Sequence, residues 1–95
     1  MDSSNIVISA QTAAATSDAF TLAGEAKIIT SGLADGEYVV LLEEEPGGTY
    51  VNAVNNGGVG VFLTRKQPSQ IIVGYGSYKL QKSVTASAVA AAVLQ

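Results

Sequence analysis

The sequence predicts an all-β domain, which is either a compact antiparallel β-sandwich of the immunoglobulin-like kind or a small β-barrel with seven to nine short strands. Runs rich in β-branched and aromatic residues recur about every 8–12 residues, and turn-forming residues separate them. No segment keeps a helical period long enough for a crossover helix. With 95 residues, the chain has room for one core, so residues 1–95 are expected to form a single domain.

The first third of the chain predicts three strands. They are expected at residues 5–9, 19–22 and 25–31, with a small, polar connection at residues 11–17. Gly24 is expected to close the second of these strands, and the alternation that follows it indicates a half-buried strand. Residues 1–5 are expected to be either part of the domain or a flexible or contact-making arm.

Residues 37–43 (EYVVLLE) form the most β-prone run. Tyr38 and Val40 share one face of this strand, and Val39 and Leu41 share the other. Apolar residues on both faces predict a central strand, or a strand whose second face is covered by a partner. The Asp-Gly pair just before the run predicts a turn.

The second half of the chain predicts five more short segments. Strands are expected at residues 49–54, 59–64, 70–73 and 77–82, and the last segment spans residues 86–94. Residues 55–58 (NNGG) predict a hairpin, and residues 74–76 (GYG) permit a bulge or a tight bend. The alanine-rich last segment is compatible with a helix, but we expect a strand whose small side chains pack closely against another element.

Composition excludes several classes of function. The chain has no cysteine and no histidine, so it lacks disulfides, thiolate nucleophiles, the commonest general base and the commonest metal ligand. We therefore expect no enzyme activity, no cofactor and no metal. Five basic residues and a net charge of −3 argue against a nucleic-acid partner. Charged residues make up 14% of the chain, against about 25% in ordinary domains, which favours a surface that lies against a partner.

Membranes are not an expected partner either. The longest apolar stretch, residues 88–94, is shorter than the roughly 20 residues of a spanning helix. The first residues carry no positive charge ahead of an apolar run, so they do not predict a signal peptide, and synthesis in the cytoplasm of the producing cell is expected.

Most of the remaining polar and aromatic features favour structural roles. Residues 43–45 (EEE) lack the spacing of a calcium loop and are expected to be a solvated strand end. The aromatic residues are expected mainly in the core, with Tyr78 as a candidate tyrosine corner. Tyr75, between two glycines, is the best candidate for an exposed contact.

Four motifs in order resemble a family of small tailed-bacteriophage virion proteins of the capsid decoration, or cement, type. They are SDAFTL at residues 17–22, GLADGEYV at 32–39, GGTYV at 47–51 and GSYKLQK at 76–82. Asp18 and Ala19 stand where that family has Gly-Pro, so the first turn departs from its pattern. The resemblance covers about residues 16–90.

The resemblance implies a β-sandwich that binds the major capsid protein on the capsid exterior and stabilises the shell, with self-association into a homo-oligomer as a further expectation. A tail, fibre or baseplate module and a carbohydrate-binding sandwich used in adhesion stay open as alternatives. The candidate interface residues are Ile6, Val7, Ile8, Arg65, Lys66, Gln67 and Tyr75. They were chosen because interfaces favour aromatic residues and arginine, and because a terminal strand can pair with a neighbour's sheet edge. The alternative is that these residues form ordinary loops and a core strand.

Overall fold

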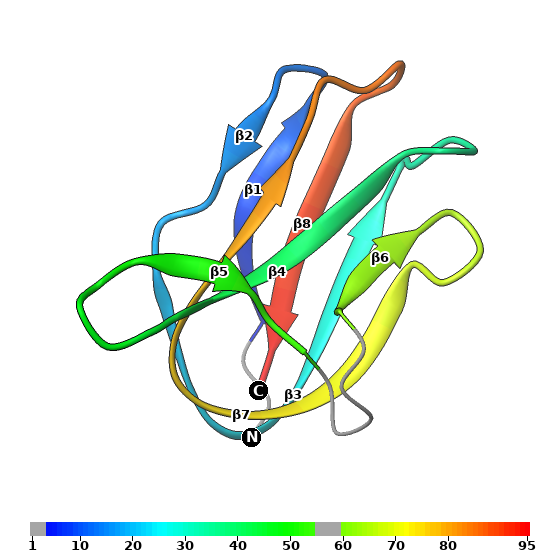
Figure 1. Ribbon diagram of the computed structural model, residues 1–95. Helices are drawn as coiled ribbons and strands as arrows, with labels where there is room; N and C mark the ends of the chain where they lie inside the picture. Colours follow the sequence, from blue (N-terminus) through cyan, green and yellow to red (C-terminus); the bar gives the residue numbers. More distant parts are fainter. Residues whose placement is uncertain (1–3, 55–59) are drawn as a thin grey trace.

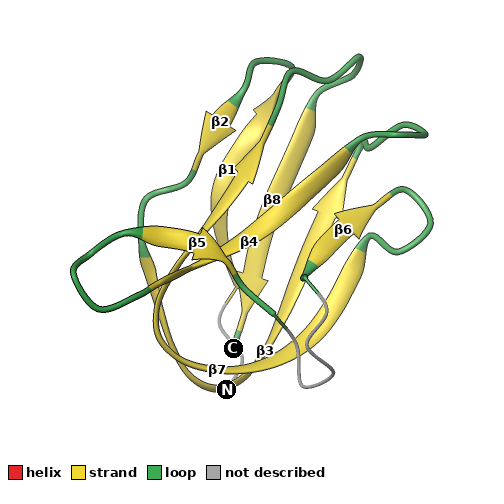
Figure 2. Cartoon of the chain, viewed as in Figure 1, coloured by secondary structure: helices red, strands yellow, loops and turns green. Residues whose placement is uncertain are grey.

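A computed structural model describes residues 4–54 and 60–95, which form eight antiparallel strands in one sheet (Figure 1, Figure 2). The strands are β1 (Ser4–Gln11), β2 (Ala15–Thr16), β3 (Phe20–Ser31), β4 (Tyr38–Glu44), β5 (Tyr50–Asn52), β6 (Phe62–Thr64), β7 (Ser69–Lys82) and β8 (Val89–Leu94). Within these two ranges no helix is long and apolar enough to cross a membrane. The expected all-β class is confirmed.

The sheet folds back on itself to make two layers. Its strand order is β1-β8-β3-β7-β4-β5. Strand β6 pairs with the same edge of β4 as β5 does, and β2 pairs with the last residues of β7. The long strands β3 and β7 curve together at one end of the molecule (Figure 1). One layer therefore contains β1, β8 and most of β3, and the other contains β4, β5 and β6. The sandwich is thus one continuous sheet and not two independent sheets.

The core lies between the two layers. Alternate residues of β3 and β8 are buried, so each of these strands sends one face inward and the other outward. The largest fully buried side chains are Leu22, Ile28, Leu41, Leu63, Leu80, Val39, Val61 and Val89. In β4 four consecutive residues are buried, and the strand is paired along both edges, with β7 on one and with β5 and β6 on the other. The central position expected for this strand is confirmed.

Two pairs of expected strands are in fact single long strands. The chain continues through Gly24 in β3, and through residues 74–76 in β7, where a strand end and a bend were expected. Gly24 pairs with Gly74 across the ladder, and Gly76 pairs with Leu22. The φ angles of Gly24 and Gly76 are 130° and 119°, which only glycine adopts easily. These glycines let both strands bend together without losing their pairing.

The expected connection at residues 11–17 contains a short strand. Ala15 and Thr16 pair with Lys82 and Gln81. The Leu80 amide donates a hydrogen bond of 2.9 Å to the buried hydroxyl of Ser17. Alanine is a weak β former and the strand has only two residues, so pairing with β7 decides its structure more than local propensity does. The hairpin expected at residues 55–58 lies outside the described residues.

The C-terminal segment is a strand, as expected. Residues Val89–Leu94 lie between β1 and β3 and pair with both. Alanine on the inward and outward positions lets β8 sit closely between its neighbours. Pairing on both sides therefore outweighs the helix propensity of alanine.

The turn between β3 and β4 is tied to a distant loop by the Glu37 carboxylate. Its Oε1 accepts a hydrogen bond of 2.8 Å from the Ala34 amide, and its Oε2 accepts one of 2.8 Å from the Ala86 amide, which precedes β8. The Ala34 and Ala86 amides, and to a smaller extent the positive charge of Lys82, hold the pKa of Glu37 below its usual value. The ionised side chain thus joins two connections that are far apart in sequence.

The Glu37→Gln variant is expected to be less stable than the natural chain at neutral pH, because an amide cannot accept both hydrogen bonds. A lowered pKa in the folded state stabilises the fold above the usual pKa of about 4.3, and this contribution is lost as the pH falls through the lower folded value. Urea midpoints measured between about pH 7 and pH 2 should therefore converge for the two proteins in acid. The exposed Glu44→Gln is the matched control, because no hydrogen bond from the described residues holds its carboxylate. A gap for Glu37→Gln that persists unchanged in acid would contradict this role.

Candidate functional site

The outer surface of the β1–β8–β3 layer and the adjoining half of β7 is apolar. We call it the β8 face and define it by eight outward residues: Ile6, Ile29, Ile71, Val73, Tyr75, Ala90, Ala92 and Leu94. Cross-strand pairing sets these side chains in rows. One row runs from Ile6 through Ala92 to Ile29, and the next runs from Leu94 through Lys27 to Ile71.

The large side chains of the β8 face are strongly exposed. Relative exposure is 69% for Ile6, 66% for Ile71, 60% for Val73 and 75% for Tyr75. Three of these four side chains lie on β7, and Ile6 lies on β1, with β8 and β3 between the two strands. Single exposed apolar residues are common on proteins, whereas a group of them on one side of a sheet indicates a contact surface. Two charges interrupt this surface, because Glu25 pairs with Val73 and Lys27 pairs with Ile71. An apolar surface with few charges resembles the centre of a protein–protein interface.

The structure separates the three candidates in the first strand. Ile6 lies on the β8 face, whereas Ile8 is 2% exposed and belongs to the core, and Val7 packs partly against that core. The expectation that Ile8 lies at a surface is therefore wrong. Residues two apart share a face in a regular strand, but an irregularity between Ile6 and Ile8 shifts the register and turns them to opposite faces.

Arg65, Lys66 and Gln67 lie exposed in the turn between β6 and β7. Arg65 Nη1 is 2.9 Å from Asp35 Oδ1, so this ion pair joins two neighbouring turns. The Gln67 amide donates to the Thr64 hydroxyl at 3.2 Å, which is a turn contact. Tyr75 is exposed, as expected, but it lies at the far bend of β7. The structure therefore does not bring this turn and Tyr75 together.

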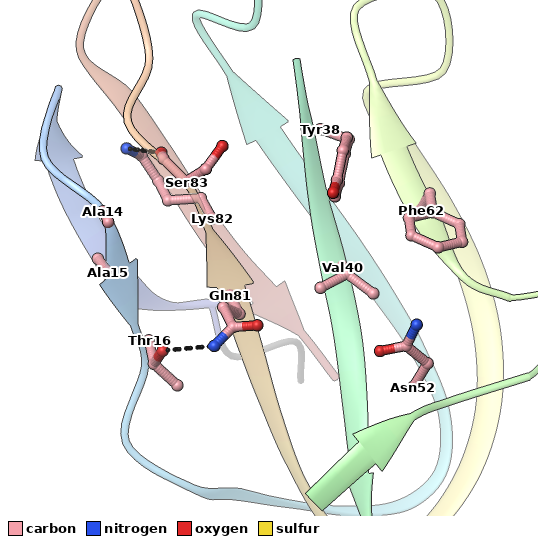
Figure 3. A pocket seen from close by; sticks show the side chains of 10 residues that line it. All are labelled: Ala14, Ala15, Thr16, Tyr38, Val40, Asn52, Phe62, Gln81, Lys82 and Ser83. Atoms are coloured by element: carbon pink, nitrogen blue, oxygen red, sulfur yellow. Dashed lines mark hydrogen bonds between the residues drawn. The ribbon is translucent and has the colours of Figure 1, made fainter. Parts of the chain in front are cut away.

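The outer surface of the other layer holds a shallow depression of about 460 Å³ (Figure 3). We call this surface the β4 face. It is defined by Thr16, Tyr38, Val40, Asn52, Phe62 and Gln81. Thr16, Gln81, Val40 and Phe62 form one cross-strand row over four strands.

Two aromatic residues of the β4 face lie outside the core, although the aromatic residues were expected mainly inside it. Tyr38 is 47% exposed and Phe62 is 38% exposed, and their rings meet edge to face at 5.5 Å. Tyr78, by contrast, is buried as expected, and its ring lies against Gly74, where an added Cβ would be 2.6 Å from the phenol oxygen. The sequence signal for Tyr38 was present, because this residue starts a strand with apolar residues on both faces.

The parts of the chain described contain no group of three or more acidic residues placed to hold a metal ion. The two candidate sites are an exposed apolar face on one layer and an aromatic-lined depression on the other.

Comparison with known proteins bears on the fold. No protein-family model matches the sequence, and no curated protein is significantly similar to it. The structure is similar to the crystal structure of the SPBc2 prophage-derived protein YomS, with a TM-score of 0.64 over 99% of this chain and 91% of that chain. Sequence identity is 11%, so this similarity concerns the fold.

Proposed function

We propose that the protein is a structural component of a phage particle, which binds the exterior of the capsid shell through its β8 face and stabilises that shell. The observation that carries this proposal is the exposure of Ile6, Ile71, Val73 and Tyr75 on one layer of the sheet. Burial of such side chains against a partner is favourable by about 25 cal/mol per Å² of apolar surface.

Two further observations support a phage origin and a binding role. The protein of similar fold is described as prophage-derived. The order of the four sequence motifs resembles that of capsid decoration proteins. Many copies on a repeating shell would also add their contributions, so that a modest stabilisation per bound copy becomes large for the whole shell.

Co-sedimentation with empty capsid shells of the phage that encodes the chain tests this proposal. We expect saturable binding and an increased resistance of the shells to heat. Absence of binding to shells, together with recovery from intact particles, would instead favour a tail, fibre or baseplate component. Copy number separates these outcomes, because a decoration protein is present in hundreds of copies and a tail component in far fewer.

The Val73→Asp variant is expected to weaken shell binding at least about tenfold, because a carboxylate on the β8 face would lose its water on contact. Val73 is 60% exposed, so the fold should tolerate the change apart from repulsion of up to about 1 kcal/mol from Glu25, its cross-strand partner. Asn52→Asp on the β4 face is the matched control, because it also adds one negative charge to an exposed strand position. Equal loss of binding in both variants would mean that general charge, and not the β8 face, governs attachment.

A further inference from the structure

The depression on the β4 face is lined by rings held in fixed positions. The Phe62 ring lies over Gly60, where an added Cβ would be 2.7 Å from the nearest ring carbon. The Phe62 carbonyl accepts a hydrogen bond of 2.7 Å from the Gln70 side chain. The edge-to-face contact with Tyr38 orients both rings. Exposed aromatic rings that are already ordered lose little entropy when a ligand packs against them.

Polar groups of the same depression are uncharged or already engaged. The Gln81 amide nitrogen donates to the Thr16 hydroxyl at 3.1 Å, which leaves the Gln81 amide oxygen directed toward the depression as an acceptor (Figure 3). Asn52 presents a carboxamide, which can donate and accept, on the opposite side of Val40 (Figure 3). The Lys82 ammonium is turned away and donates to the carbonyls of Ala13 and Ser83 at 2.6 and 3.0 Å.

Ordered aromatic rings together with uncharged polar groups favour one class of ligand. No acidic residue lines the depression, and the ammonium of its one cationic residue is engaged by carbonyls, so the site offers little to a charged ligand. An aromatic ring attracts the weakly positive C–H groups of an apolar face, while carboxamides and a hydroxyl bind hydroxyl groups at its rim. A pyranose ring has both features.

We propose that the β4 face binds a neutral saccharide, with a pyranose ring packed on Phe62 and Tyr38 and its hydroxyl groups bonded to Asn52 and Gln81. Because the β4 and β8 faces lie on opposite layers, a capsid-bound copy would present this site to the surroundings. The saccharide site does not depend on capsid attachment, and the two proposals stand or fall separately.

Saturation-transfer NMR with the purified chain tests the site. The probes are maltose, cellobiose, lactose and N,N′-diacetylchitobiose at about 1–10 mM, a range suited to weak single-site binding. We expect transfer from the protein to at least one of these sugars, strongest at the C–H protons on one face of a ring. Backbone shift changes should map to β4, β6 and the end of β7. Absence of transfer to all four sugars would overturn the proposal.

Variants locate the site. Phe62→Ala is expected to weaken binding at least about tenfold. Asn52→Ala should weaken it as well, and this exposed substitution guards against a folding defect in Phe62→Ala. Tyr75→Ala is the matched control, because it removes an exposed aromatic ring from the β8 face and should leave sugar binding unchanged. Binding that survives both Phe62→Ala and Asn52→Ala, or that is lost in Tyr75→Ala, would contradict the assignment.

Discussion

Replacing Leu80 with alanine is expected to lower the free energy of unfolding by about 2–5 kcal/mol. Leu80 is fully buried, and it pairs with Leu41 where β7 passes the central strand β4. Its backbone also binds Ser17, so the surrounding strands are fixed in place and cannot collapse into the space that a smaller side chain leaves. For a domain of this size each lost kcal/mol lowers the melting temperature by about 4–8 °C.

Thermal and urea unfolding of Leu80→Ala measure this effect directly. Ile71→Ala is the matched control, because it removes a side chain of the same size from the same strand at a position that is 66% exposed. Its effect should stay within about 1 kcal/mol, the span of strand propensities. If the two variants were equally stable, the core would not lie between the two layers as described.

Replacing Gly32 with alanine is expected to lower the free energy of unfolding by a similar amount, about 2–5 kcal/mol, for a different reason. Gly32 has a φ of 93°, a conformation that costs an L-residue about 1–2 kcal/mol. A Cβ at this position would also collide with the carbonyl oxygen of Ala88, just before β8. Because the obstacle is backbone, relief requires a shift of the strand, which adds about 1–3 kcal/mol.

Gly36→Ala separates these two contributions. Gly36 also has a positive φ, 82°, but a Cβ there would meet open space. This variant should therefore show the conformational cost alone, about 1–2 kcal/mol. Chemical unfolding of both variants under the same conditions gives the difference. Equal destabilisation would mean that Gly32 is required for its backbone angle and not for the close approach of β8.

The two functional proposals have opposite signatures on one set of variants. Val73→Asp should lose shell binding and keep sugar binding. Phe62→Ala should lose sugar binding and keep shell binding. Such a double separation would show that the two faces act independently. Loss of both activities in one variant, with a lower melting temperature, would instead report a damaged fold.

The candidate contact surface was only partly accessible from the sequence. Tyr75 was expected to be exposed, since it lies between two glycines, and Ile6 was a candidate in the first strand. Ile71 and Val73 were not, although residues 71–73 (IIV) place apolar side chains on both faces of a strand. That pattern also describes a central, fully buried strand such as β4. The exposed strand and the buried strand differ in how many of their faces other parts of the protein cover, and only the tertiary structure shows this.

What the sequence determined by itself is local. Alternation of side chains predicted the half-buried strand that ends at Ser31, and the Asp-Gly pair predicted the turn before β4. These features depend on residues close together in the chain, since a strand has a period of two and a turn depends on a few φ angles.

Tertiary structure decided the rest. The register irregularity in β1 turns Ile6 outward and Ile8 inward, and pairing of Gly24 with Gly74 joins four expected strands into two. The curvature of β3 and β7 then leaves one layer's outer face apolar and places Tyr38 and Phe62 at the surface of the other. Each of these outcomes depends on which distant residue lies opposite, and cross-strand partners here are separated by up to about ninety positions in sequence. The absence of cysteine and histidine limits the chemistry of this chain. The folding of one sheet into two layers gives it two different outer surfaces, the β8 face and the β4 face.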